Sequence, residues 1–573
     1  MVLVGSLRTI ARLYPDEVEV GQQLQESLSF LDTELAPETV VRGGYGAGLL
    51  SLLFVVPLLA TGLGFPVALF LTVAIAVLLI HSIHSVPNLL AAFRRTEALG
   101  SVPNLIGRAV LRMQIQPATE SAVRFAAETG YGPLSENLSA HIDRSMGTPR
   151  TGIISFAEEW AEWFPAVRRS AHLLVMAQDA PEAERRRTLD RTLMSILDGT
   201  RNQMADFTAS IRGPTTALYA FGVMIPLALV ALVPAATLVG YPVPILFFIV
   251  TYNVVLPIVL IAASLWLLVR RPVAFPPPKV TREHPDVPDR LWIRLFWAPI
   301  VGAPAFVLTL LWGPSHLAVL AGVGFGLGGV LIALFRPIIL VRNHVRAVEE
   351  HLVDALYLVG RQVSEGEAVE SVIQQAGDRV PEETGAVFES AAGLQRRLHV
   401  GVEEAFMGEY GALRDIPSPR AHSTAGLLAI ASREGKPAGR AIVSMADHLE
   451  ELQDVDDEAK RQLANVTGTL DHTASYFGPL VAGATVGLAD IIVSQDVDLS
   501  ETQAAASTLP SDQLGIVVGV FVITLCFILV PLSVMLRHGL DRALLGYRVG
   551  RSLLSAIPLY VITIVLVSMI NTS

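Results

Sequence analysis

The sequence predicts an all-α membrane protein that has about nine transmembrane helices and two homologous helical domains in the cytosol. Three observations indicate this fold class. The 573-residue chain is 52% hydrophobic and 17% charged, a composition typical of a protein with many membrane spans. Its apolar residues gather in segments of about 20, which is the length that crosses a bilayer as a helix. Its basic residues all fall in alternate segments between those spans.

The apolar segments predict the spans directly. They fall at 43–62, 65–84, 216–239, 243–269, 295–312, 315–335, 473–493, 514–536 and 552–570. The alternate segments hold all 42 Lys and Arg residues: 3 in 1–42, 15 in 85–215, 6 in 270–294, 14 in 336–472 and 4 in 537–551. The opposite connections, 63–64, 240–242, 313–314 and 494–513, hold none. Because basic loops stay in the cytoplasm, the N-terminus is predicted inside and the C-terminus outside, with the protein in the cytoplasmic membrane.

The spans divide the chain into eight predicted parts. These are a cytosolic helical extension at 1–42, a transmembrane hairpin at 43–84, cytosolic helical domain one at 85–215, a second hairpin at 216–269, a proline-rich cytosolic linker at 270–294, a third hairpin at 295–335, cytosolic helical domain two at 336–472, and three C-terminal spans at 473–573 with an outer loop at 494–513. Leu352, Leu356, Val359 and Val363 show the helical spacing of apolar residues that predicts helical bundles for the two domains.

The two halves of the chain share short stretches of sequence. Their offsets agree to within a few residues, between 250 and 257, which indicates a tandem repeat with both domains on the same side of the membrane. The matching pairs are Leu105–Val110 with Leu358–Val363, Glu120–Ser121 with Glu370–Ser371, Leu173–Ala177 with Leu427–Ala431, and Thr216–Tyr219 with Thr473–Tyr476.

Motifs for catalysis are absent from the sequence. The nearest approach to a phosphate-binding loop, Glu434–Pro437, has no Ser or Thr after its Lys, so the backbone cradle for phosphates is missing. There is no Gly-x-Ser-x-Gly elbow and no His-Glu-x-x-His pair. The single cysteine, Cys526, excludes an internal disulfide and a cysteine metal cluster. We therefore expect no enzymatic activity, no cofactor and no resident metal ion.

The predicted spans contain few polar residues, and this argues against an ion-coupled transporter. Asp490 lies near the outer end of its span, within reach of interfacial water. Asn253 lies near the centre of another span, and we interpret it as an inter-helix hydrogen-bonding residue rather than as part of a conduction path. Gly322, Gly324 and Gly326 form a surface where helices can approach closely, either within the chain or in a dimer.

The two predicted domains differ in charge. Domain one holds 15 basic and 14 acidic residues, whereas domain two holds 14 basic and 23 acidic residues. Domain one carries the cluster Arg185–Arg187, and domain two ends in an acidic run from Asp454 to Glu458. Surfaces of opposite charge favour the electrostatic steering of a charged partner. Charged residues on solvent-exposed helix faces give the same composition without any partner.

This layout resembles the type II secretion system F family, whose members are the inner-membrane platform proteins of type IV pili, type II secretion systems and archaella. The resemblance covers most of residues 85–573, and the nine spans with a cytosolic extension point to an archaeal platform protein. It rests on the layout and on two loose helical patterns of domain two, namely His351–Val363 with Glu367–Ile373, and Leu427–Gly435 with Ala438–Ile442.

The resemblance implies a scaffold that couples a cytosolic hexameric ATPase to the insertion of pilin or archaellin subunits into a filament. Membrane lipids and a second copy of the chain in a homodimer are further expected partners, and nucleic acid is not. The residues expected to dock the ATPase are charged, and they are Arg185, Arg186, Arg187, Arg396, Arg397, Asp454, Asp456, Asp457 and Glu458.

Two other classes of function were weighed. A transporter or channel is the main alternative, and it would need polar or charged groups along a path through the spans. A membrane-embedded enzyme such as an intramembrane protease would need paired catalytic residues, and Asp490 has no second intramembrane acid as a partner.

Overall fold

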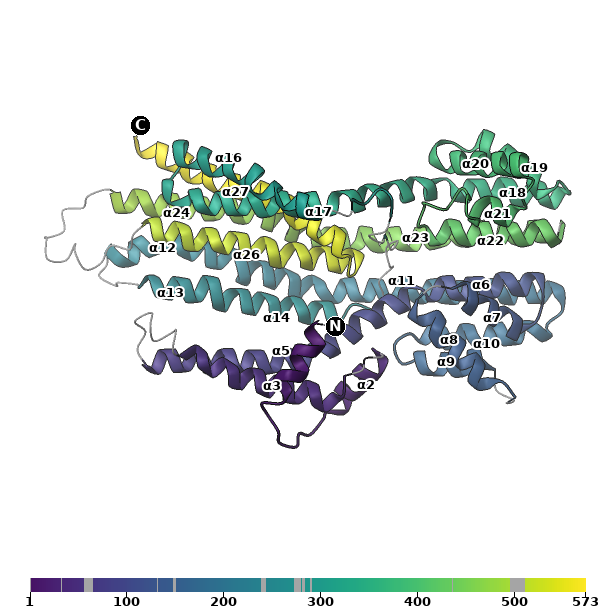
Figure 1. Cartoon of the computed structure of the whole chain (residues 1–573), viewed down its shortest axis with the longest axis horizontal. Helices are drawn as coiled ribbons and strands as arrows, with labels where there is room; N and C mark the ends of the chain where they lie inside the picture. The colour runs from purple at the N-terminus through teal and green to yellow at the C-terminus, as the bar shows by residue number, and fades with distance from the viewer. Residues whose placement is uncertain are drawn as a thin grey trace. The chain divides into compact units, whose positions relative to one another are not determined.

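In the computed structural model, all regular secondary structure of the described residues is helical (Figure 1). It describes residues 2–31, 33, 35–55, 65–130, 132–147, 151–238, 244–272, 280, 284–288, 291–434, 436–494 and 511–572. No strand occurs among these residues, which confirms the all-α prediction for them. Residues 495–510 of the outer loop 494–513, the turn at 240–242, Gly435 and much of the linker 270–294 fall outside the described residues.

The chain forms two compact units, Met1–Ala98 and Leu99–Ser573. The smaller unit contains α1 (Val2–Ala11), α2 (Gln22–Phe30), α3 (Pro37–Ser51), the short turn η1 (Leu52–Phe54) and most of α5 (Phe65–Gly100). Helix α1 packs on α3, where a Cβ atom at Gly46 would lie 2.4 Å from the carbonyl oxygen of Ile10. Glycine in α3 therefore allows the two helices to approach closely.

The larger unit contains two helical bundles. The first bundle consists of α6 (Val102–Ile115), α7 (Thr119–Thr129), α8 (Pro133–Ser145), α9 (Gly152–Trp160), α10 (Pro165–Asp179) and α11 (Glu182–Tyr219). The second bundle consists of α18 (Leu352–Glu365), α19 (Val369–Arg379), α20 (Glu382–Leu398), α21 (Val402–Met407), α22 (Pro419–Glu434) and α23 (Lys436–His472). Each bundle is thus six helices, of which the last is long.

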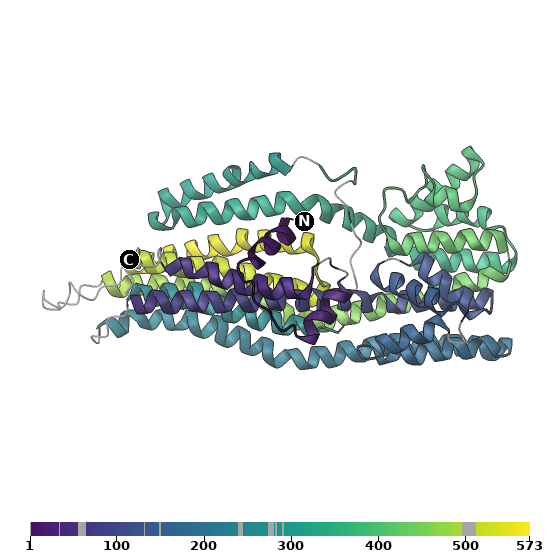
Figure 2. The same ribbon diagram turned by 60° about the horizontal axis from the view of Figure 1, so that its bottom comes forward.

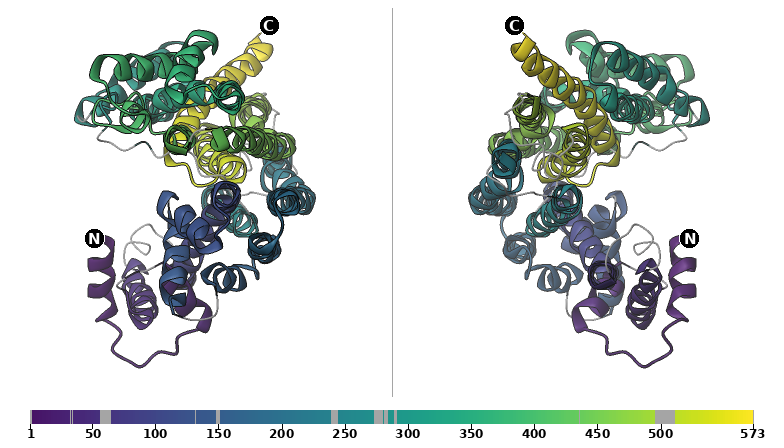
Figure 3. Two further views of the ribbon diagram at one scale, coloured as in Figure 1. Left: turned by 90° about the vertical axis from the view of Figure 1, so that its right-hand side faces the viewer. Right: turned by 90° about the vertical axis from the view of Figure 1, so that its left-hand side faces the viewer.

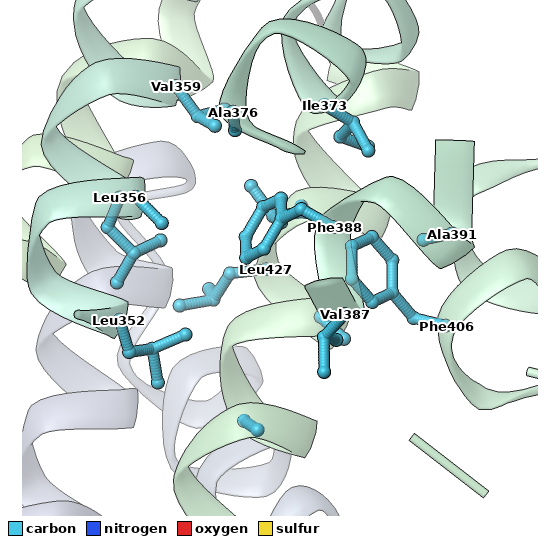
Figure 4. Close-up of a cluster of buried hydrophobic side chains, with 14 of the residues drawn as sticks. Leu352, Leu356, Val359, Ile373, Ala376, Val387, Phe388, Ala391, Phe406 and Leu427 are labelled. Carbon is cyan, nitrogen blue, oxygen red and sulfur yellow. The ribbon is translucent and has the colours of Figure 1, made fainter. Parts of the chain in front are cut away.

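The second bundle has a continuous apolar core. Leu352, Leu356 and Val359 on α18 point toward side chains of α19, α20 and α21, as Figure 4 shows. Phe388 and Phe406 lie at its centre with their rings 5.4 Å apart in an edge-to-face arrangement. The predicted 3.6-residue spacing of apolar residues in α18 therefore corresponds to its buried face.

The remaining helices of the larger unit are long and apolar. They are α12 (Ile225–Leu238), α13 (Ile245–Val250), α14 (Leu256–Val269), α15 (Leu291–Leu295), α16 (Trp297–Trp312), α17 (Ala318–Glu350), α24 (Gly478–Ser494), α26 (Ser511–His538) and α27 (Arg542–Thr572), with short turns η2 (Ala220–Met224), η3 (Thr251–Val255), η4 (Ser315–Leu317) and η5 (Thr473–Phe477). Within this unit both bundles lie at the same end of these helices (Figures 1 and 2), and Figure 3 views the helices end-on.

Eight helical stretches among the described residues are long and apolar enough to cross a membrane. They fall at Ile75–Gln114, Glu182–Val230, Ile245–Val269, Ile293–Trp312, Ser315–Glu365, Gly439–Ile492, Asp512–His538 and Arg542–Met569. Eight of the nine predicted spans overlap these stretches. The first predicted span, 43–62, runs into residues 56–64, which lie outside the described residues.

Several of these stretches are longer than a bilayer needs, because a bundle helix continues directly into a span. Helix α23 passes through the π-helical turn η5 into α24, and α11 passes through the π-helical turn η2 into α12. Gly439–Ile492 contains 54 residues, so at 1.5 Å per residue it is about 80 Å long, whereas a bilayer core is about 30 Å thick. The bundle half of each such helix therefore lies outside the apolar layer.

Glycines set the distance between several spans. A Cβ atom at Gly322 would lie 3.0 Å from Phe306, and one at Gly326 would lie 3.0 Å from the carbonyl oxygen of Ala298, so both glycines face α16. A Cβ atom at Gly324 would instead lie 2.0 Å from Ile557 of α27. The three glycines singled out in the sequence thus line two different helix contacts within the chain.

Asn253 lies in the π-helical turn η3, and its side-chain oxygen is buried without a hydrogen-bond partner in the described part of the chain. The sequence predicted an inter-helix hydrogen bond at this residue. The neighbouring Tyr252 makes that contact instead, because its hydroxyl donates a hydrogen bond to the carbonyl of Pro226 on α12. Consecutive residues of a helix point in different directions, and here Tyr252 rather than Asn253 reaches the adjacent span.

We expect Gly360→Ala to lower the free energy of unfolding by about 1–3 kcal/mol, because overpacking a close helix contact forces the backbones apart. A Cβ atom at Gly360 would lie 2.8 Å from Val443 Cγ2 and 2.9 Å from its backbone nitrogen. Thermal unfolding of the detergent-solubilised protein measures the effect. Gly426→Ala on α22 is the matched control, because nothing lies within 4 Å of a Cβ atom there, and it should stabilise the protein by about 0.5–1 kcal/mol. Equal effects of the two changes would contradict this account.

Candidate functional site at the interface of the two bundles

The two bundles meet along α23. Helices α6 and α11 of the first bundle both contact it, and within its own bundle it contacts α18 and α22. Leu197 on α11 packs between Leu452 and Val455 on α23, and all three are buried. Leu111 on α6 joins the buried core of the second bundle. Apolar packing therefore makes the two bundles one continuous body at this surface.

Two hydrogen bonds from α6 strengthen this contact. Arg108 donates from Nη2 to Ser423 Oγ at 2.5 Å, and Gln114 donates from Nε2 to Ser444 Oγ at 3.0 Å. Arg108 belongs to the stretch Leu105–Val110 that the sequence repeats in the second bundle. The first copy of the repeated motif therefore lies at the interface, whereas Arg361 and Gln362 of the second copy bond Glu365 and Gln375 within their own bundle.

His448 on α23 is the most buried titratable group at this interface. It is 3% exposed and lies so close to α6 that a Cβ atom at Gly107 would come within 2.2 Å of its Nε2. Neither ring nitrogen has a well-formed hydrogen bond to the described residues. Burial lowers the pKa of His448 from 6.5 to about 4, and the carbonyl of Pro103 partly opposes that shift. The ring is therefore neutral at pH 7 and fills the space that Gly107 leaves.

Carboxylates flank His448 on the same helix. The Tyr357 hydroxyl of α18 lies 2.5 Å from Asp447 Oδ1 and 3.0 Å from Glu450 Oε2. The hydrogen bond to Asp447 is the main cause of the raised pKa of Tyr357. A phenol carries one proton, so at any moment only one of the two carboxylates receives it.

Acidic groups also face each other between α11 and α23. Burial and then the charge of Asp447 raise the pKa of Asp190 on α11, and Arg186 lowers it. Burial raises the pKa of Glu451 on α23, which the cation of Arg201 opposes and the surrounding carboxylates reinforce. The interface therefore combines apolar attraction with repulsion between like charges, which limits its net stability.

An ion pair and several hydrogen bonds connect the ends of the apolar helices. Arg342 on α17 pairs with Asp541, a residue that is 4% exposed and that also accepts hydrogen bonds from the backbone N–H groups of Ala543 and Leu544 at the start of α27. Arg294 donates to the carbonyl of Leu334 at 2.8 Å. These contacts hold α17, α27 and the segment before α16 at fixed relative positions.

The predicted docking arginines of the first bundle differ in accessibility. Arg185 is half-buried and donates to the carbonyls of Ala177 and Ala180 at 3.2 and 3.0 Å, so it caps the end of α10. Arg186 pairs with Glu182 on its own helix, and Arg187 is exposed. Only Arg186 and Arg187 therefore present their charge to solvent.

The predicted docking residues of the second bundle form two separate groups. Arg396 and Arg397 are exposed in the last turn of α20. On α23, Asp456 is 9% exposed and its Oδ2 lies 2.6 Å from Lys460 Nζ, so this carboxylate is turned inward. The others in the acidic run, Asp454, Asp457 and Glu458, are exposed. Among the described residues no ion pair joins the basic candidates to this acidic run: Arg186 pairs with Glu182, and Asp456 pairs with Lys460.

Sequence reasoning missed the residues of α18 and α23 that lie at or beside the interface, namely Tyr357, Asp447, His448, Glu450 and Glu451. The available signal was the repeated glycine, Gly107 in one copy and Gly360 in the other, since both allow a helix to approach α23. No group of three or more His, Cys, Asp or Glu suited to a metal ion occurs in the part of the chain that the structure describes.

Comparison with known proteins adds no relative: no protein-family model, curated protein or solved structure matches this chain. The functional argument therefore depends on the sequence and on the geometry described above.

We expect the stability of the protein to fall as the pH drops from 6.5 toward 4. His448 has a folded pKa of about 4 and an unfolded pKa of 6.5, so the unfolded state takes up the proton first and the loss approaches about 3 kcal/mol. Asp190 and Glu451 have raised pKa values, so their protonation relieves repulsion and offsets part of this loss.

Thermal unfolding across that pH range, compared between the wild type and His448→Leu, isolates the histidine. The substituted protein should lose less stability on acidification. His172→Leu, at an exposed position on α10, should keep the wild-type profile. If His448→Leu leaves the pH profile unchanged, the histidine does not carry the effect.

Proposed function

We propose that the chain is a tandem duplication, each copy consisting of a helical bundle that leads into membrane spans. The order and spacing of helices support this. Helices α6 and α18 both have 14 residues and begin at Val102 and Leu352, and α7 and α19 both have 11 residues and begin at Thr119 and Val369. The π-helical turns η2 and η5 begin 253 residues apart, at 220 and 473.

Both bundles are cytosolic in this proposal. They lie in the segments that hold 29 of the 42 basic residues, and the positive-inside rule places such segments in the cytoplasm. Nine spans, including 43–62, then place the N-terminus inside and the C-terminus outside the cytoplasmic membrane.

The chain serves as the platform protein of a type IV pilus-like filament or secretion machine, where it couples a cytosolic hexameric ATPase to the insertion of pilin or archaellin subunits. One observation carries this proposal: the long helices α11 and α23 belong to the bundles and continue without a break in the helix into spans. A displacement imposed on the bundles is thereby transmitted to the membrane helices.

The interface between the bundles supports the same role. Helix α23 contacts both bundles and continues into α24, so it is positioned to combine the displacements of the two. The function follows the type II secretion F resemblance, and no catalytic group is required of this chain. The ATPase supplies the free energy, and pilin subunits with apolar helices dock laterally against the spans. A homodimer in the membrane is part of the proposal.

A transporter or channel is the second candidate, and one observation favours it. Asn253 Oδ1 and Ser264 Oγ are buried in the span Ile245–Val269 without hydrogen-bond partners among the described residues. Unpaired polar atoms in a span can line a path for solute or water. The candidate is weaker because these two atoms do not form a continuous path.

Co-purification tests the platform role. The full-length protein in detergent is mixed with the secretion ATPase encoded in the same genome, and bound ATPase and its turnover are measured. We expect specific binding with stimulated turnover, because the platform is the ATPase's docking partner. Loss of this binding when the bundles are deleted supports the proposal. Complete absence of binding, with an active ATPase and a folded platform, returns transport to first place.

We expect the double change Arg186→Ala and Arg187→Ala to weaken ATPase binding about tenfold or more, because each exposed cation loses a charge-assisted contact. Arg185 is left intact, since its removal would uncap α10. The control is Arg168→Ala with Arg169→Ala, which removes two exposed arginines from α10. Pull-down affinity is the readout. Equal binding by both double variants would remove Arg186 and Arg187 from the docking surface.

A further inference from the structure

A cleft of about 180 Å³ lies in the first bundle, away from the interface with the second bundle. It lies between helices α7, α8 and α9. For comparison, a cavity of about 150 Å³ holds a molecule the size of benzene, so this cleft has room for a small ligand. Polar and charged groups line much of the cleft. They include Thr119, Glu120, Arg124, Ser145 and Thr151.

The hydroxyl group of Thr119 is buried, and the packing of the bundle does not account for a polar group at this position. The residue is 2% exposed, and its Oγ1 has no hydrogen-bond partner among the described residues. Its backbone N–H is satisfied separately by Gln178 Oε1 at 2.9 Å. The equivalent residue of the second bundle, the first of α19, is Val369, which is equally buried. Since valine fills the same space without a buried polar atom, the hydroxyl of Thr119 requires a partner in the cleft.

Arg124 contributes an available cation to the same cleft. Its side chain is exposed and makes no ion pair within 4.0 Å among the described residues, even though Glu120 lies one turn earlier on α7. The equivalent position in α19 is Gln374. The first bundle thus carries a hydroxyl and a guanidinium at two positions where the second bundle has an apolar and a neutral side chain.

Two helices direct their N-terminal ends at the cleft. Helix α7 begins at Thr119, whose backbone N–H already bonds Gln178 Oε1, and α9 begins at Gly152, where the N-cap residue Thr151 makes no side-chain hydrogen bond. Gly152 brings the start of α9 close to α8, because a Cβ atom there would lie 2.8 Å from the Cα atom of Ile142. Helix N-termini favour anions through free N–H groups and the helix dipole. Glu120 and the C-terminal end of α8 oppose an anion in the cleft, whereas Arg124 and the start of α9 favour one.

We propose that this cleft binds a phosphate group, either as the free ion or on a small ester. The Arg124 guanidinium pairs with the phosphate oxygens, the Thr119 hydroxyl donates a hydrogen bond to one of them, and the start of α9 supplies further backbone donors. The site belongs to one bundle only and goes beyond the platform role, so it stands whether or not the protein docks an ATPase.

Isothermal titration calorimetry on the full-length protein in phosphate-free buffer tests the proposal. The probes are inorganic phosphate and AMP, with sodium chloride at matched ionic strength as the reference. We expect saturable binding that Arg124→Gln weakens about tenfold or more and that Thr119→Val weakens several-fold. Each change introduces the residue found at the equivalent position of the second bundle, Gln374 or Val369. Arg168→Gln on α10 removes an exposed arginine outside the cleft and should leave the affinity unchanged.

The outcomes separate clearly. Tighter binding of AMP than of phosphate identifies an ester as the ligand, and equal or weaker binding of AMP identifies the free ion. Absence of saturable binding to both probes overturns the proposal and leaves water as the partner of the Thr119 hydroxyl. Binding that is unchanged in both Arg124→Gln and Thr119→Val also overturns it, since the anion then binds elsewhere. Thermal unfolding of each variant confirms that the bundle is folded.

Discussion

The close packing of α23 against helices of both bundles is the contact on which the larger unit depends. Gly360 allows α18 to approach α23, and Gly107 allows α6 to approach it on another side. A side chain at either position would meet backbone or a buried ring. Because α23 continues through η5 into a span, this packing also fixes how the bundles connect to the membrane helices.

The same surface is not built for maximal stability. Leu197, Leu452 and Val455 provide apolar attraction, while Asp190 and Glu451 carry like charges across the contact. An interface in which attraction and repulsion partly cancel can rearrange at a modest free-energy cost. This balance suits a scaffold whose bundles change their relative position in a working cycle. By contrast, the buried pair of Arg342 and Asp541 holds span ends rigidly, because separating it would leave an unpaired buried charge.

The two bundles share a plan and differ in chemistry. The second bundle has a continuous apolar core and nearly all of the excess negative charge of the chain. The first bundle has Thr119 and Arg124 at a cleft where its counterpart has Val369 and Gln374. The proposed duplication would account for both facts if one copy kept the structural role while the other diverged.

The sequence alone determined the helical fold class and the apolar stretches that overlap eight of the nine predicted spans. These features depend on local hydrophobicity and on 3.6-residue periodicity, which any short stretch of the amino-acid sequence shows directly. Only the tertiary structure decided which charged residues are accessible, as Arg185 shows by capping α10 and Asp456 by pairing with Lys460. It also decided that His448 lies against α6 at the bundle interface and that Tyr357 bonds Asp447 beside it. Contacts between residues 90 to 315 positions apart depend on how whole helices pack, and no local pattern of sequence encodes them.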